Sequence, residues 1–200
     1  MATNTGPVWR ISRRLNFSIL ETGKELQKKH YIPGQHGPTH RAKPSNYGLQ
    51  KDEKQKIRYM YGLSEKQFFN TYKKAVKKRG VTGTVLLQML ESRVDNLVYR
   101  MGFAPTRRAA RQLVSHGHIL VNGHKLDIAS AQVKPGSVIE LKEKSRNLSS
   151  VVASLDATNS FKDFVEVDKD KRKGKYIRLP ERKELNQEVN ELLVIEFYNR

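Results

Sequence analysis

The spacing of hydrophobic residues predicts helices through the first half of the chain. Apolar side chains recur at helical spacing over residues 49–61, with Gly62 placed to end that helix, and again over residues 84–101. Between these stretches, Ser64 and Gln67 have the spacing of a capping box, in which each side chain binds the other residue's backbone N–H group. The pattern therefore predicts a pair of helices followed by a longer one.

Beyond residue 105 the pattern changes to one helix followed by short strands. Thr106 is placed to cap the helix and Gly117 to end it. Residues 119–126 surround an Asn-Gly pair, which is the dipeptide favoured in the two-residue turn of a β-hairpin. Residues 138–141 predict a further strand of the same small antiparallel sheet. The predicted fold class is therefore α+β.

Residues 1–46 lack a clear period and predict an extended basic N-terminal arm. They hold eight basic and two acidic residues, together with many Gly and Pro residues that interrupt helices. Aromatic residues such as Trp9 and Phe17 stand among the charges, so we expect the arm to fold on its binding partner. Gly34, Gln35 and His36 lie in a predicted turn, where glycine allows the backbone to approach a phosphate.

The charge of the chain predicts a polyanionic partner. The formal net charge is +18, with 28 basic and 10 acidic residues before Ser150 and 10 of each from there on. A solvated surface normally mixes both signs, so this asymmetry favours a portion that binds phosphates joined to a neutral portion.

Arginines of the predicted helices are the strongest candidates for phosphate contacts. Arg107, Arg108 and Arg111 fall opposite the apolar side of the helix after Thr106, and we expect their loss to leave folding nearly intact. Guanidinium groups bind phosphate through paired N–H groups and keep their charge. Arg93 and Arg100 stand seven residues apart in the predicted helix over residues 84–101, so two turns place them on one stripe. The residues predicted to contact RNA are Arg10, Arg13, Arg14, Gly34, Gln35, His36, Lys51, Lys54, Arg58, Arg93, Arg100, Arg107, Arg108, Arg111, Gln112, Ser115, His116 and His118.

Composition and motifs argue against several other classes. Cysteine is absent, which excludes disulfides, thiolate metal sites and thiol nucleophiles. The first twenty residues contain no sustained apolar run, so neither a signal peptide nor a membrane span is predicted, and we expect a cytoplasmic location. Ser115, His116 and Asp127 are residue types of a catalytic triad, but a nucleophile elbow is missing and capping explains them better. We predict no catalytic residues and no cofactor.

Five segments carry a resemblance to the small-subunit ribosomal protein four (S-four) family. RVDNLVYRMGFAPTRRAARQLVSHGHILVNG closely resembles the RNA-binding module named after that family, a module that other RNA-handling proteins also contain. Segments near both ends narrow the resemblance to the ribosomal proteins themselves: GPVWRISRR (6–14), YIPGQHG (31–37), YGLQKDEKQKIRYMYG (47–62) and RLPER (178–182).

The resemblance implies that the module is inserted into a mostly helical domain. The implied segments are a basic arm over 1–46, a helical domain over 47–91 completed by 177–200, the module over 92–155, and the rest of the insertion over 156–176. Family members bind a multi-helix junction of small-subunit ribosomal RNA, nucleate assembly of the subunit body and contribute to translational accuracy. The implied partners are this RNA, other small-subunit proteins, notably protein five, and messenger RNA where it enters the subunit, but no membrane.

One departure from the family pattern concerns zinc. Some members carry a Cys-x-x-Cys pair in the arm, and Trp9 and Ser12 stand at the equivalent positions here, so the chain resembles the cysteine-free, bacterial-type branch. Three arm histidines, His30, His36 and His40, are possible substitutes, but histidines in such a basic segment more often face phosphate or solvent. We predict no metal site.

Two alternative functions fit part of the sequence. An RNA-modifying enzyme such as a pseudouridine synthase can carry the same module, but 200 residues leave too little chain for a separate catalytic domain. A DNA-binding protein fits the charge but fits the module less well, and affinity for folded RNA over duplex DNA would separate the two.

Overall fold

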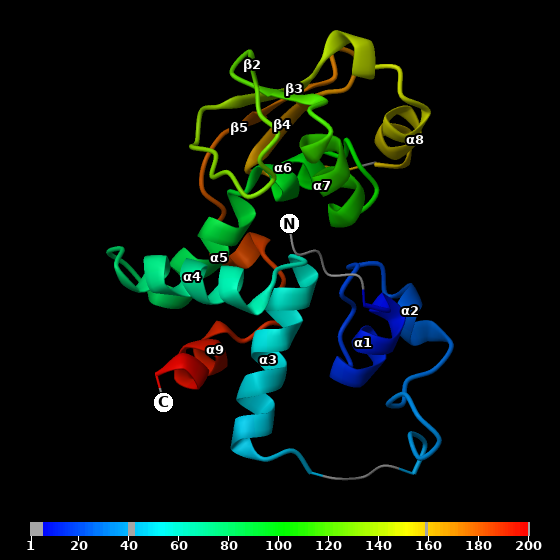
Figure 1. Cartoon of the computed structure of the whole chain (residues 1–200), viewed down its shortest axis with the longest axis vertical. Helices are drawn as coiled ribbons and strands as arrows, with labels where there is room; N and C mark the ends of the chain where they lie inside the picture. Colours follow the sequence, from blue (N-terminus) through cyan, green and yellow to red (C-terminus); the bar gives the residue numbers. More distant parts are fainter. Residues whose placement is uncertain (1–5, 40–42, 159, 200) are drawn as a thin grey trace. The chain divides into compact units, whose positions relative to one another are not determined.

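The computed structural model describes residues 6–39, 43–158 and 160–199 and divides the chain into two compact units (Figure 1). Unit one consists of Met1–Gly83 together with Asn186–Arg200, and unit two of Thr84–Leu185. Unit two is thus inserted between the two parts of unit one. The family resemblance implied these two boundaries at residues 91/92 and 176/177.

Unit one is helical. Its elements are α1 (Val8–Leu15), α2 (Lys24–Gln27), α3 (Asn46–Met60), α4 (Glu65–Val76), the first residues of α5 (Thr82–Glu91) and α9 (Glu191–Tyr198). Helix α3 packs along α9, so the last helix lies beside one made about 130 residues earlier (Figure 1). Ser64 and Gln67 form the predicted capping box at the start of α4, and Gly62 adopts a positive φ of 62° after α3.

The N-terminal segment is more folded than an extended arm. Helices α1 and α2 pack against each other, and Leu15, Phe17 and Ile19 are buried beside them. The buried Glu25 carboxylate organises the segment, because it accepts hydrogen bonds from the backbone and from nearby hydroxyl groups. The residues around Glu25 have no periodic pattern, so this anchor could not be predicted from hydrophobic spacing.

Unit two combines helices with an antiparallel sheet. Its elements are the rest of α5, α6 (Val94–Arg100), α7 (Arg107–Ser115), β1 (Ile119–Val121), β2 (His124–Lys125), β3 (Val138–Leu141), the 3₁₀ turn η1 (Glu143–Ser145), α8 (Ser149–Ala157), β4 (Val165–Asp168), β5 (Lys173–Tyr176) and the 3₁₀ turn η2 (Arg182–Glu184). In the described part of the chain the sheet has five strands in the order β2-β1-β3-β5-β4. Residues of α6, α7 and α8 form one hydrophobic core with inward-facing residues of the strands.

Local signals in unit two were predicted correctly. The Thr106 hydroxyl accepts a hydrogen bond from the Ala109 N–H group at the start of α7, as expected of a helix cap. Asn122 and Gly123 both adopt positive φ angles, 51° and 81°, as a two-residue hairpin turn between β1 and β2 requires. Strands β4 and β5 were not predicted.

The prediction of one continuous helix over residues 84–101 is wrong. The chain forms α5 and α6, separated by Ser92 and Arg93. The Val94 N–H group donates to the Ala131 carbonyl at 3.0 Å, and the Val133 N–H group donates to the Ser92 carbonyl at 2.9 Å. These bonds to a distant loop replace the bonds that a continuous helix would make within itself.

Candidate nucleic-acid interface

Helix α7 carries most of the predicted RNA contacts of the module. Arg108, Gln112, Ser115 and His116 are exposed, whereas Arg107 and Arg111 are half-buried. His118 follows the helix, and its Nδ1 atom lies 2.8 Å from the Ser145 hydroxyl oxygen. We call Arg107, Arg108 and Arg111 the arginine face.

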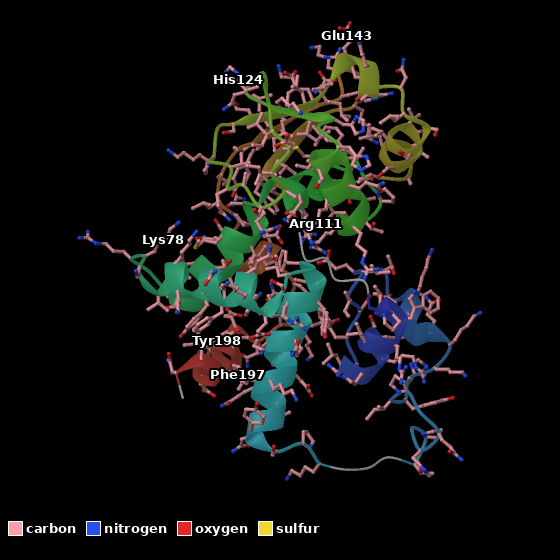
Figure 2. All side chains as sticks on the ribbon, viewed as in Figure 1. Lys78, Arg111, His124, Glu143, Phe197 and Tyr198 are labelled. Atoms are coloured by element: carbon pink, nitrogen blue, oxygen red, sulfur yellow. The ribbon has the colours of Figure 1, made fainter. Side chains whose placement is uncertain are left out.

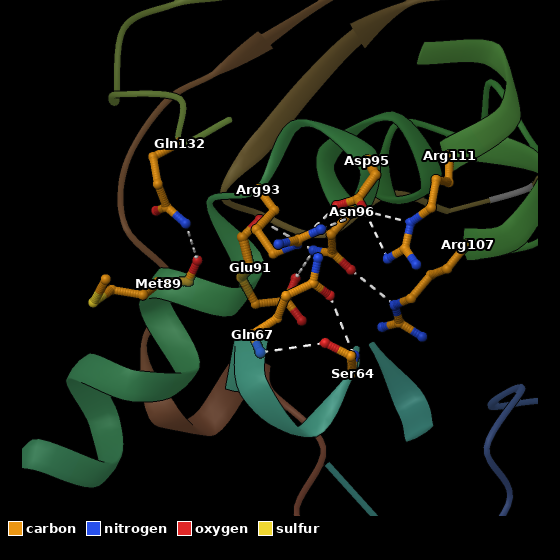
Figure 3. Close-up of polar contacts among 10 residues, drawn as sticks. All are labelled: Ser64, Gln67, Met89, Glu91, Arg93, Asp95, Asn96, Arg107, Arg111 and Gln132. Carbon is orange, nitrogen blue, oxygen red and sulfur yellow. Dashed lines mark hydrogen bonds and ion pairs between the residues drawn. The ribbon is translucent and has the colours of Figure 1, made fainter. Parts of the chain in front are cut away.

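One buried carboxylate holds two arginines. The side chain of Asp95, on α6, is 4% exposed and accepts two hydrogen bonds from Arg111, at 2.9 Å from Nε and 2.8 Å from Nη2 (Figure 3). Asp95 also accepts hydrogen bonds from Arg93, at 3.0 Å from Nε and 2.8 Å from Nη2. Asp95 therefore joins the N-terminus of α6 to the middle of α7.

A second polar chain runs beside the first. Glu91, at the end of α5, accepts hydrogen bonds from Arg100 at 3.0 and 2.9 Å and from the Asn96 amide nitrogen at 2.6 Å. The Asn96 side-chain oxygen then accepts a hydrogen bond from Arg107 Nε at 2.8 Å (Figure 3). The Arg107 guanidinium also lies 4.6 Å from the centre of the Tyr99 ring, in cation–π range. Arg107 is therefore oriented from two sides.

These contacts correct two expectations about the arginines. Arg93 precedes α6 and Arg100 ends it, so they do not share a stripe of one long helix, and their side chains are only 7% and 10% exposed. With so little of each guanidinium exposed, Arg93 and Arg100 are weaker candidates for direct phosphate contact than Arg108, which is exposed, and Arg111, which is 16% exposed. Charge and packing are also not on separate faces of α7, because Arg107 and Arg111 bind α6.

Asp95 and Asn96 were the residues that the sequence did not assign to the interface. They are polar and adjacent, and they sit between Val94 and Leu97, which are both fully buried. A polar pair within a buried stretch needs partners, and those partners are on another helix. Two adjacent polar residues within an apolar stretch were therefore the feature of the sequence that could have identified Asp95 and Asn96.

Helix α3 carries Lys51, Lys54 and Arg58, and the structure separates their roles. Lys51 is exposed, as predicted. Lys54 is buried, with its Nζ atom 2.7 Å from Glu65 Oε1 and 4.4 Å from the centre of the Phe197 ring, so its predicted surface position is wrong. Arg58 Nε lies 3.7 Å from the other Glu65 oxygen.

Glu65 is held as a carboxylate by these partners. Burial raises the pKa of the Glu65 carboxyl, but the hydrogen bonds from Lys54 and Tyr198 and the positive charges of Lys54 and Arg58 outweigh it and keep the pKa below its ordinary value. Lys54 is therefore committed to an ion pair inside unit one, next to Phe197 and Tyr198 of α9, which Figure 2 labels.

The N-terminal segment presents a second group of cations. Arg10 and Arg14 are exposed on α1, while Arg13 donates to the Tyr31 carbonyl at 3.2 Å and lies 5.0 Å from the centre of the Tyr31 ring. Arg13 thereby links α1 to the predicted phosphate-approach turn.

That turn follows Tyr31. Gly34 has a φ of +124°, which residues with a side chain rarely adopt, and Gln35 and His36 are exposed beside it. A backbone left accessible by glycine next to exposed polar side chains suits an approaching phosphate.

Metal-binding clusters and membrane-spanning helices are both absent from the described residues. No group of three or more His, Asp or Glu side chains in that part of the chain is placed to hold a metal ion. His40, one of the three arm histidines considered above, lies outside the described residues. Within the same ranges, no helix has the length and apolar character needed to cross a membrane.

Two known families match consecutive parts of the chain. The family described as Ribosomal protein S4/S9 N-terminal domain matches residues 3–91, and the family described as S4 domain matches residues 92–139. The fold and its arginine-bearing helix therefore define an α+β protein of the class that carries this RNA-binding domain.

Full-length relatives identify the family within this class. The chain is 56% identical to the small ribosomal subunit protein uS4 of Geobacillus sp. (strain WCH70) and to that of Geobacillus stearothermophilus, in both cases over 200 residues and 100% of each chain. It is 57% identical over 203 residues to the uS4 protein of Mycoplasma mobile, again over 100% of each chain. The chain belongs to the uS4 family of small ribosomal subunit proteins.

Proposed function

We infer that this chain is a structural protein of the small ribosomal subunit that binds ribosomal RNA directly. The observation that carries this inference is the match to uS4 proteins over the whole of both chains. Such relatives are ribosomal components and not enzymes, and the net charge of +18 suits an RNA partner. The ribosome, and with it the bacterial cytoplasm, is the corresponding location.

We propose that the RNA is held by cations and polar groups that reach the surface of both units. In unit two these are the arginine face and the polar residues near it, and in unit one they are Arg10, Arg14, Lys51 and the turn at Gly34. Arg93, Arg100 and Lys54 have a supporting role, because each is buried against a carboxylate. Each phosphate neutralised adds roughly 0.7 to 0.9 to the dependence of log affinity on log salt, so a broad surface predicts a slope of several units.

Finer roles follow from the family resemblance. We propose that the RNA site is a multi-helix junction bound early in assembly of the subunit body, and that the protein contributes to translational accuracy. Contact with protein five of the same subunit and with incoming messenger RNA belongs to the same proposal.

Sedimentation of the tagged protein in a bacterial extract tests the proposal. The protein should migrate with small subunits, and with free small-subunit ribosomal RNA when binding is measured with purified components. Migration away from small subunits in the extract would refute the ribosomal assignment, and equal affinity for duplex DNA of matched charge would refute RNA recognition.

A pair of triple variants tests where the RNA is held. Alanine at all three positions of the arginine face should lower RNA affinity by more than alanine at Lys73, Lys74 and Lys77, three exposed lysines of α4 and the residue after it. Both variants lose the same formal charge, so equal losses of affinity would mean that net charge alone holds the RNA. Lys78, nearby in the sequence, points away from the ribbon into solvent (Figure 2).

A further inference from the structure

Asp95, at the start of α6, reduces the positive charge of the RNA-binding module. Asp95 places one negative charge between Arg93 and Arg111, so that three ionised groups together carry a single positive charge. If affinity for RNA depended on charge alone, this carboxylate would weaken binding. Its position therefore requires another explanation.

The geometry supplies one, because Asp95 and its neighbour each hold one arginine of α7. Asp95 binds Nε and Nη2 of Arg111 at 2.9 and 2.8 Å, and Asn96 binds Nε of Arg107 at 2.8 Å. The two arginines are four residues apart, which places them one above the other on a helix. Two adjacent residues of α6 thus orient two guanidinium groups one turn apart.

Both oriented arginines still keep part of the side chain at the surface, although the Nη2 atom of Arg107 is buried. The Arg111 side chain is 16% exposed, compared with 4% for Asp95, and Arg107 is half-buried. Arg108, between them in sequence, is exposed. A guanidinium held along its Nε edge keeps its direction, whereas a free arginine side chain loses rotamer freedom when it binds a phosphate. Fixing the side chain during folding removes that cost from RNA binding.

We propose that Asp95 and Asn96 are positioning residues for RNA binding, which orient Arg111 and Arg107 toward the phosphate backbone of ribosomal RNA. This inference rests on the proposed function, and it extends that function from the arginines to the residues of α6 that direct them. By orienting Arg111, Asp95 raises the affinity for RNA by more than its negative charge lowers it.

The test compares two substitutions with the same change in charge. Asp95→Asn and Asp127→Asn each raise the net charge of the module by one, but the Asp127 side chain is 53% exposed and lies 3.3 Å from Lys125 in an exposed pair. Affinity of the full chain for purified small-subunit ribosomal RNA of Geobacillus stearothermophilus would be measured by filter binding. Asp127→Asn should bind as tightly as the original chain or more tightly, and Asp95→Asn should bind about tenfold more weakly.

A double-variant cycle separates positioning from general stability. If Asp95 acts through Arg111, Asp95→Asn should cost much less affinity in a chain that already carries Arg111→Ala. A loss of the same size in both backgrounds would mean that Asp95 only stabilises the start of α6, and it would overturn the proposal. Circular dichroism melting of each variant identifies any that do not fold.

Asn96→Ala provides a variant without a change in charge. It removes the bond to Arg107 and the two bonds from the Asn96 amide to Glu91, while Glu91 stays bound to Arg100 at 2.9 Å. The melting temperature of this variant therefore has to be compared with that of the original chain. Weaker RNA binding by this variant supports positioning, and unchanged binding by both Asn96→Ala and Asp95→Asn contradicts it. If the original chain itself fails to bind the RNA, the proposed function fails instead.

Discussion

Replacing Glu25 with Gln should loosen the N-terminal segment while preserving its shape. The carboxylate accepts hydrogen bonds from the Leu20 N–H group at 2.9 Å, from the Ser18 hydroxyl at 3.0 and 3.1 Å and from the Thr22 hydroxyl at 3.1 Å. A glutamine amide keeps one acceptor oxygen for Leu20 but turns its nitrogen toward a hydroxyl, and the charge is lost. Hydrogen bonds to charged groups contribute about 1.5–3 kcal/mol each, so we expect a net loss of about 2 kcal/mol.

Trp9 makes this loss measurable, because it is the only tryptophan and belongs to α1, which packs against the α2 helix that contains Glu25. Urea unfolding followed by Trp9 fluorescence should show a lower midpoint for Glu25→Gln than for the original chain. Glu188→Gln is the matched control, since Glu188 is an exposed acid of the same unit. Equal midpoints for the Glu25 variant and the original chain would refute the role of the carboxylate.

The effect of Glu25 should also depend on pH. Burial raises the pKa of the Glu25 carboxyl, but the bonds from Leu20, Ser18 and Thr22 outweigh burial and hold the pKa below its ordinary value of 4.5. A lowered pKa in the folded chain stabilises the segment fully above pH 4.5, and the stabilisation is lost as pH falls through the lowered value. The gap between the original chain and Glu25→Gln should therefore narrow in that acidic range. A gap that stays constant there would contradict the linkage.

Three further outcomes follow from other parts of the molecule. Burial, followed by the hydrogen bond and the negative charge of Glu65, raises the pKa of Tyr198. Tyr198 should therefore stay protonated when the other tyrosines ionise in an alkaline absorbance titration. Tyr198→Phe should remove this high-pKa group from the titration and lower stability by about 1 kcal/mol. Gly123→Ala adds a methyl group where there is open space but φ is +81°, so thermal melting should report a loss of about 1 kcal/mol from backbone strain alone, and an unchanged melting temperature would refute that reading. Metal analysis of the purified protein should find much less than about one equivalent of zinc, and a chelator should leave RNA binding unchanged. Stoichiometric zinc would contradict the prediction that the N-terminal arm holds no metal site.

Features that depend on neighbouring residues could be predicted from the sequence. The cap at Thr106, the Ser64–Gln67 box and the Asn-Gly turn each need only residues within three positions of one another, and all three are present. The break between α5 and α6 depends instead on bonds from Val94 and Asp95 to a loop more than 30 residues away. The apolar spacing continues across that break, so periodicity alone could not reveal it.

The candidate site was predictable in its residue types but not in their roles. The sequence placed Arg107 and Arg111 opposite the apolar side of α7, yet nothing in the helix itself indicated that Asp95, 16 residues before Arg111, would bind it. Lys54 is a second example. Its charge predicted a solvent-exposed side chain, but it is buried in unit one in contact with Glu65 and Phe197. Pairing across elements decides which cations remain at the surface.

The insertion of unit two has a consequence for the order in which the chain matures during synthesis. Residues 84–185 are all made before α9 exists, so the five-stranded sheet and its helices can form while unit one is still incomplete. Long-range bonds of unit one form only once residues 190–199 have been made, among them those of Tyr72 with Asn199 at 2.8 Å, Gln50 with Glu196 at 2.9 Å and Tyr198 with Glu65 at 2.9 Å. Unit one can therefore be completed only after the whole of unit two has been made.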